Sequence, residues 1–237
     1  MKYRLCVNII FVFSSFTFSQ KQAFLYEWTQ IMDLYFCTDN KQIEADYYMY
    51  ESQESKKVYS TSHSIVKSKN DKIYQNIGDI ITLMDSDYMV LVDHSESTIL
   101  LDRSPRDYFN LISQINFDTS LQSIIKIEVL HSSFSTKKYR IYINSTEYEK
   151  IEFTFNKQTK HLIDMSLFYS KEIALNEEKP DELSKPKLVI KYKPMIKVQE
   201  PFYTINANPY FSFDGKQIQA KNTCKKYQCI DNRVRFK

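Results

Sequence analysis

The residue types of a hydrolytic active site occur side by side at Asp93-His94-Ser95. Consecutive residues of a strand point to opposite faces, however, so these side chains cannot form the hydrogen-bonded relay of a catalytic triad. Serine followed by lysine three positions later, as at Ser64 and Lys67, is a second pattern with hydrolytic chemistry. Such pairs arise by chance in a chain rich in both residues, and a three-residue step on a strand separates the two side chains. We therefore expect no catalytic residue and a protein that is not an enzyme.

Motifs for a cofactor or a metal ion do not occur in the sequence either. It contains no Walker loop, Gly-x-Gly-x-x-Gly, His-Glu-x-x-His or Gly-x-Ser-x-Gly segment, and it has only two glycines, which limits loops that cradle phosphates. The four histidines are dispersed. Acidic pairs such as Asp85 and Asp87 are typical of solvated turns. We expect no cofactor and no metal.

Three cysteines lie beyond the first 19 residues, at positions 37, 224 and 229. Cys224 and Cys229 would be roughly 16 Å apart on one straight strand, at about 3.3 Å per residue. A disulfide needs Cα atoms within about 7 Å, so this candidate disulfide requires a turn between the two residues. The alternatives are a bond from Cys37 to one of them, or free thiols. No second cysteine pair or nearby histidine completes a metal site.

The N-terminus has the organisation of a secretory signal peptide. Lys2 and Arg4 give a basic start, residues 5–13 are mostly apolar, and Thr17 and Ser19 place small residues before a cleavage site. Counted from Leu5 to Phe18, the apolar run is about 14 residues long, which is shorter than the roughly 20 residues of a spanning helix. We expect cleavage after residues 1–19, no transmembrane anchor in the mature protein, and export to the periplasm, with secretion or the outer surface as alternatives. An uncleaved anchor or a buried N-terminal element is the other interpretation.

The composition argues against nucleic acid as a partner. Removing residues 1–19 takes away two basic residues and no acid, so the net charge falls from +3 to +1, whereas nucleic-acid binding needs a concentrated basic face. Aromatic residues make up 15% of the chain, and tyrosine and phenylalanine favour the half-buried surface of a sheet. We expect residues 20–237 to form a single β-rich domain.

Hydrophobic periodicity predicts two helices. Residues 21–37 have an amphipathic pattern, with Leu25, Trp28, Ile31 and Tyr35 along one face. Serine and proline at positions 104 and 105 are typical of a helix start, which predicts a second helix over about residues 105–118. Residues 78–83 are expected to form a short helical connector.

Two-residue alternation predicts about ten or eleven strands in the rest of the chain. The better defined ones are expected at 42–50, 57–67, 72–77, 88–93, 98–101, 125–130, 139–144, 151–155, 163–169 and 188–192. Asn70-Asp71 predicts a hairpin turn. Residues 171–187 are a charged excursion, and residues 201–237 form a hairpin tail with a turn at Asp214-Gly215. The fold class is mainly β (α+β), a large curved antiparallel sheet or an unclosed β-barrel covered by two or three helices.

The order of these elements resembles that of the periplasmic lipoprotein-carrier family (LolA/LolB-like). Residues 21–37 resemble the first helix of that family, and the segments 124–129, 138–144 and 149–155 resemble its later strands. The likeness covers residues 21–195. It implies an unclosed barrel whose helices plug the opening around an apolar cavity for acyl chains. The family's arginine that helps hold its lid closed has three candidates here, Arg103, Arg106 and Arg140.

The resulting hypothesis is an exported carrier-like protein that binds an apolar or lipidated ligand between a sheet and a helix. Its partners would be lipid or lipoprotein acyl chains and envelope proteins. Three helix residues would form a lid, and eight strand residues would line the cavity. The lid residues are Trp28, Ile31 and Tyr35, and the lining residues are Tyr47, Met49, Ile127, Val129, Ile141, Ile143, Phe153 and Met165.

Two other interpretations remain open. A structural or adhesive envelope module would have the same apolar residues in a filled core and would hold its partner through exposed tyrosines and strand edges. A hydrolase would need a polar cleft whose residues converge only in the folded chain.

Overall fold

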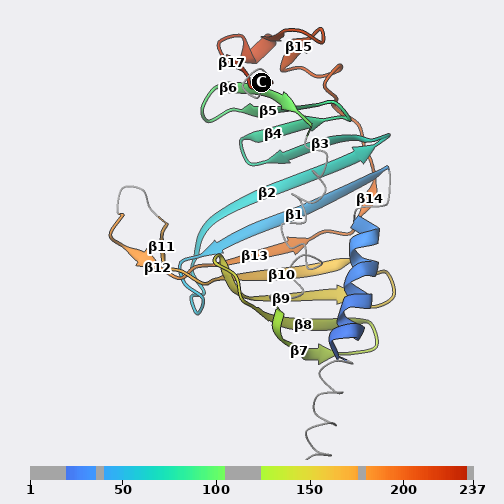
Figure 1. Cartoon of the computed structure of the whole chain (residues 1–237), viewed down its shortest axis with the longest axis vertical. Coiled ribbons are helices and arrows are strands. Elements are labelled where there is room, and N and C mark those ends of the chain that lie inside the picture. The colour runs from blue at the N-terminus through green and yellow to red at the C-terminus, as the bar shows by residue number, and fades with distance from the viewer. Residues whose placement is uncertain (1–19, 36–39, 105–123, 176–179, 234–237) are drawn as a thin grey trace, which may run out of the picture. The chain divides into compact units, whose positions relative to one another are not determined.

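The computed structural model describes residues 20–35, 40–104, 124–175 and 180–233 (Figure 1). The protein is mainly β, as predicted: within these residues, thirteen strands belong to one mixed sheet that is not closed, and four more form two-stranded ribbons. The chain divides into two compact units. Of the described chain, unit 1 holds residues 20–35, 51–54, 124–175 and 180–187, and unit 2 holds residues 40–50, 55–104 and 188–233.

Unit 1 combines one helix with a run of antiparallel strands in the order β10-β9-β8-β7. Residues 20–35 are helical, which confirms the first predicted helix over these residues. The charged excursion carries the short β11-β12 ribbon. The strands of unit 1 are β7 (Ile124–Ser132), β8 (Thr136–Ile143), β9 (Tyr148–Asn156), β10 (Leu162–Tyr169), β11 (Ile173–Ala174) and β12 (Leu183–Ser184).

Unit 2 is built from antiparallel hairpins in the order β6-β5-β4-β3-β2-β1, with β14 also pairing with β1 and β17 added beside β6. Its elements are β1 (Lys41–Tyr50), β2 (Val58–Lys69), β3 (Lys72–Ile77), β4 (Ile80–Met84), β5 (Tyr88–Asp93), β6 (Thr98–Arg103), β13 (Lys187–Tyr192), β14 (Ile196–Lys197), β15 (Phe211–Phe213), β16 (Ile218–Ala220), the 3-10 helix η1 (Asn222–Cys224) and β17 (Gln228–Asp231).

Two tight turns decide the path of unit 2. Asn70 and Asp71 both have positive φ, 52° and 56°, which gives the primed turn that matches strand twist and confirms the predicted hairpin. The expected helical connector over residues 78–83 is wrong, because Gly78 turns at φ 57° and β4 then pairs with β3. The apolar residues there are buried strand positions, which a short apolar run cannot distinguish from helix.

The C-terminal tail completes the core of unit 2. Ile205, Phe211 and Cys224 are buried together with seven side chains from β3 to β6. The predicted Asp214-Gly215 turn joins β15 to β16, with Gly215 at φ 88°. The last strand of the tail departs from the expected antiparallel pattern, since β17 pairs with β6 in parallel, with Cys229 opposite Ile99.

Other expectations lie outside the described residues. These are the signal peptide at 1–19, the second helix at about 105–118, and the position of Cys37. The single domain over residues 20–237 stays a prediction. Within the described chain, no helix has both the length and the apolar character that a membrane span requires.

Candidate functional site

The helix of unit 1 packs an aromatic stripe onto its sheet. Phe24, Trp28 and Ile31 follow at steps of four and three, the spacing that places residues on one helix face, and their exposed fractions are 0%, 6% and 0%. The Trp28 ring lies 5.1 Å from that of Phe153 on β9, and the Phe24 ring lies 5.3 Å from that of Tyr139 on β8. The helix therefore covers strands β8 and β9 (Figure 1).

Beneath the helix, apolar side chains form two rows that cross four strands. Register places residues of neighbouring strands directly opposite each other, where their side chains share a face. One row is Val129–Tyr139–Phe153–Met165, and the other is Ile127–Ile141–Ile151–Leu167. Each row runs from β7 through β8 and β9 to β10. The two rows form one continuous apolar face.

Burial along these rows decreases toward β7. In the first row, Phe153 is 0% exposed and Tyr139 2%, whereas Val129 is 47% exposed. In the second row, Ile141 is fully buried and Ile127 is half-buried. The apolar face is thus sealed at β8 and β9 and is open at its β7 end.

Polar contacts fix the helix to the same strands. Glu27 accepts hydrogen bonds from Lys137 Nζ at 2.9 Å and from the Tyr139 hydroxyl at 2.6 Å. Burial, and next the carboxylate of Glu27, raise the pKa of Tyr139 above its usual value. Near the other end of the helix, the backbone N–H of Leu162 donates to the Tyr35 hydroxyl at 3.1 Å. Burial raises the pKa of Tyr35 to about 12, although this hydrogen bond opposes the change.

The structure brings together nine of the eleven predicted ligand-binding residues in unit 1. Ile143 continues the same face opposite Ile124. Tyr47 and Met49 lie instead on β1 in unit 2, where both are half-buried. The prediction omitted Phe24, Tyr139 and Ile151. The seven-residue spacing between Phe24 and Ile31 could have revealed Phe24. The alternation along β8 and β9 could have revealed Tyr139 and Ile151.

Charged side chains occupy the opposite face of the same strands. Arg140 donates from Nε to Glu152 Oε1 at 2.7 Å, and Lys138 Nζ lies 2.9 Å from Glu152 Oε2. Glu152 is only 7% exposed. Burial by itself raises the pKa of this carboxyl, but the hydrogen bonds from Lys138 and Arg140 outweigh it and hold the pKa below its usual value. Because Arg140 alternates with the helix-facing residues Tyr139 and Ile141, it lies on the wrong face to hold a lid.

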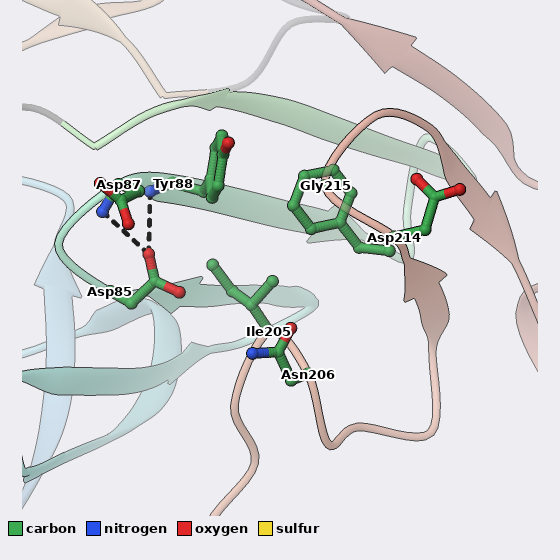
Figure 2. Close-up of a pocket in the computed structure, with 8 residues that line it drawn as sticks. Asp85, Asp87, Tyr88, Ile205, Asn206, Asp214 and Gly215 are labelled. Carbon is green, nitrogen blue, oxygen red and sulfur yellow. Dashed lines mark hydrogen bonds between the residues drawn. The ribbon is translucent and has the colours of Figure 1, made fainter.

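A separate pocket lies in unit 2, with a volume of about 420 Å³. Figure 2 shows it beside the β4-β5 turn, where Asp85 Oδ1 accepts from the backbone N–H groups of Asp87 and Tyr88 at 3.0 and 2.9 Å. Asp214 accepts in the same way from two N–H groups of its own turn, which lowers the pKa of its carboxyl. Asp85 stabilises its turn, in which Asp87 also lies, as predicted for this acidic pair. The charge of these carboxylates and of Asp214 would favour a cation over an acyl chain. The full lining is Asp85, Asp87, Tyr88, Ile205, Asn206, Phe213, Asp214 and Gly215.

The side chains of Asp93, His94 and Ser95 do not form a hydrogen-bonded relay. Asp93 Oδ1 accepts from the backbone N–H and hydroxyl of Ser95, which closes the β5-β6 turn, while His94 Nδ1 lies 2.9 Å from the hydroxyl of Tyr227. Within the described residues, no group of three or more histidines, cysteines or carboxylates is placed to hold a metal ion.

The candidate disulfide between Cys224 and Cys229 is not formed in the structure, where both are free thiols. Cys224 ends η1 and is fully buried in the apolar core of unit 2, and Cys229 packs against that core from β17. Both thiols pack among apolar side chains, which agrees with the alternative of free thiols given by the sequence.

No family model matches the sequence, and a search of curated proteins finds no match. Among solved structures, an uncharacterized conserved protein from Thermus thermophilus is similar with a TM-score of 0.44 and 7% identity, over 87% of this chain and 98% of that chain. The Mycobacterium tuberculosis lipoprotein LppX has a TM-score of 0.43 and 10% identity, over 77% and 98%. A LolA superfamily protein from Nitrosomonas europaea has a TM-score of 0.30 and 14% identity, over 75% and 94%. These similarities concern the fold alone.

Proposed function

We propose that this protein is an exported, non-enzymatic binding protein whose unit 1 holds an apolar or acyl-chain ligand between the helix and the sheet. The observation that carries the proposal is the pair of apolar rows, sealed at β8 and β9 and open at β7. The open end gives an apolar chain a continuous surface, and removing that surface from water would contribute about 25 cal/mol per Å².

The proposed path starts at Val129 and Ile127 and continues beneath the helix. Trp28 and Ile31 already fill the inner part of this path, so a long chain enters only if the helix moves outward. Helix displacement is the step in which the predicted lid residues would act. Glu27, Lys137 and Tyr139 would set its energetic cost, because their hydrogen bonds join helix to strand.

The ligand class is a lipid or the acyl chain of a lipoprotein, and the partners are other envelope proteins. The signal-peptide pattern of residues 1–19 supports this assignment, because such a pattern favours export. We propose the periplasm as the compartment.

The single tryptophan of the chain gives a direct test. Palmitate that carries bromine on its chain quenches tryptophan fluorescence on contact, so it should quench Trp28, and unlabelled palmitate should reverse the effect. Val129→Glu should weaken this binding by at least about tenfold, because it places a charge on the apolar path. Val58→Glu is the matched control, since Val58 is 38% exposed on β2 in unit 2. Equal quenching of both variants, or none of the native protein, would overturn the proposal.

The competing function is an interaction module with a filled core. It is favoured by the complete burial of Phe24, Ile31 and Phe153. In that case acyl chains should neither bind nor raise the stability of the protein, and a protein partner should bind without displacing the helix.

A further inference from the structure

Among the described residues, the outer strand of unit 1 has an open edge, and it carries exposed apolar side chains. Strand β7 ends the order β10-β9-β8-β7, and β8 is the strand that pairs with it among the described residues. Ile125, Val129 and Leu130 on β7 are 71%, 47% and 40% exposed, and Phe134 in the turn that follows is 88% exposed. Open strand edges offer unpaired backbone groups to another strand.

The central part of β7 is regular. Residues 126–129 pair in unbroken register with residues 142–139 of β8, and irregularities at Ile125 and Leu130 bound this segment. Ile127 and Val129 share the apolar face with Ile141 and Tyr139. Lys126 and Glu128 lie on the opposite, charged face, with their side chains 2.6 Å apart.

This pattern is self-complementary in one register. When two copies of β7 pair antiparallel about a twofold axis at Ile127, Lys126 of each copy lies opposite Glu128 of the other, and Ile125 lies opposite Val129. A twofold axis at Lys126 would place two lysines opposite each other, and an axis at Glu128 would place two glutamates opposite each other. Both of these registers are repulsive. An axis between residues would pair the apolar face of one copy with the charged face of the other.

We propose that β7 is a dimerisation edge, and that its occupant is β7 of a second copy of this chain, paired antiparallel about Ile127. The pairing continues the row of Ile127 into the second copy and covers part of Val129 and Ile125. It forms an isologous interface, in which the same residues of both copies meet. The inference goes beyond the proposed function and does not depend on ligand binding.

Charges and bulges on an edge strand often prevent association. On β7, however, the two charges have opposite signs and are two residues apart, so in the twofold register they attract. An edge protected by repulsion would carry charges of one sign. The irregularities limit the pairing to a short central segment, which indicates a dimer of modest affinity and disfavours open-ended aggregation.

Charge exchange tests the register. Lys126→Glu should weaken dimerisation by at least about tenfold, because two pairs of glutamates then face each other, and Glu128→Lys should do the same with lysines. An equimolar mixture of these two variants should form heterodimers, and the double variant that exchanges both charges should regain the dimer. Sedimentation velocity over about a hundredfold range of protein concentration measures all four samples.

The control is a second ion pair of unit 1. Lys185 and Glu149 are 3.0 Å apart and are similarly exposed, so Lys185→Glu should leave the dimer intact. Far-UV circular dichroism checks that each variant is folded. A native protein that stays monomeric at the highest concentration would overturn the proposal, as would single charge variants that dimerise like the native protein.

Discussion

The hydroxyl of Tyr139 on β8 donates a hydrogen bond of 2.6 Å to Oε2 of Glu27 on the helix. Lys137, two residues earlier on the same strand, donates to both carboxylate oxygens of Glu27 at 2.9 and 3.1 Å. The side chains of Lys137 and Glu27 are only 16% and 22% exposed. The pair joins the helix to the sheet beside the apolar face, so its strength should affect both stability and helix displacement.

Glu27→Gln should therefore destabilise the protein by about 1–3 kcal/mol, because it leaves the ammonium of Lys137 without a carboxylate in a partly buried place. Urea unfolding followed by circular dichroism measures this change. The exposed pair of Lys193 and Glu44, 3.1 Å apart, serves as the control, and Lys193→Met should cost no more than about 1 kcal/mol. Equal effects at the two pairs would contradict the role assigned to Glu27.

Trp28→Ala should lower the free energy of unfolding by about 3–5 kcal/mol, since it leaves a cavity under the helix. Trp28→Asp should cost more, because it also buries a charge, and so would not test ligand uptake alone. Thermal unfolding by circular dichroism measures both variants, with Trp28→Phe as the milder control. A change below about 1 kcal/mol in Trp28→Ala would show that the helix is not packed as described.

Alkaline pH should destabilise the protein through Tyr35. Its folded-state pKa is raised to about 12 from an ordinary value of 10.0, so the neutral form is favoured in the folded state. The stabilisation is complete below pH 10 and is lost as the pH rises from about 10 to about 12. Tyr35→Phe should be less stable than the native protein at pH 8, through the lost hydrogen bond from Leu162, and this difference should shrink by pH 11. A constant difference in urea unfolding would contradict the assignment.

Low pH should destabilise the protein through Glu152, whereas high pH does so through Tyr35. The folded-state pKa of Glu152 is lowered from 4.5, so its contribution is present above about pH 4.5 and is lost as the pH falls below that value. Glu152→Gln should be clearly less stable than the native protein at pH 7, and the two proteins should become more alike toward pH 3. Exposed Glu172→Gln is the control, and a pH-independent gap for Glu152→Gln would argue against the ion pairs with Lys138 and Arg140.

Local signals predicted much of this fold from the sequence. Asn70-Asp71 gave its turn because few residues accept positive φ at two successive positions, and alternation gave most strands. The residues over 78–83 were misassigned because buried strand and helix share the same short apolar pattern. The helix stripe was predicted correctly at Trp28 and Ile31, but its first position was assigned to the half-buried Leu25 and not to the fully buried Phe24.

The sequence identified many residues of the candidate site but not how they pair across the strands. Alternation identified Ile127, Val129, Ile141 and Phe153 as residues of one face. The cross-strand rows depend on register, however, and the irregularities at Ile125 and Leu130 shift that register without a sequence signal. The pairing of β17 with β6 joins distant segments, which local patterns do not encode.

Native mass spectrometry of the mature protein, purified from the cell envelope without detergent, tests acyl-chain binding most directly. We expect a reproducible added mass that releases as a lipid or acyl species, and the Val129→Glu variant should carry less of it than Val58→Glu. A bare polypeptide mass that stays unchanged after incubation with lipids and acylated peptides would contradict acyl-chain binding and favour the interaction module.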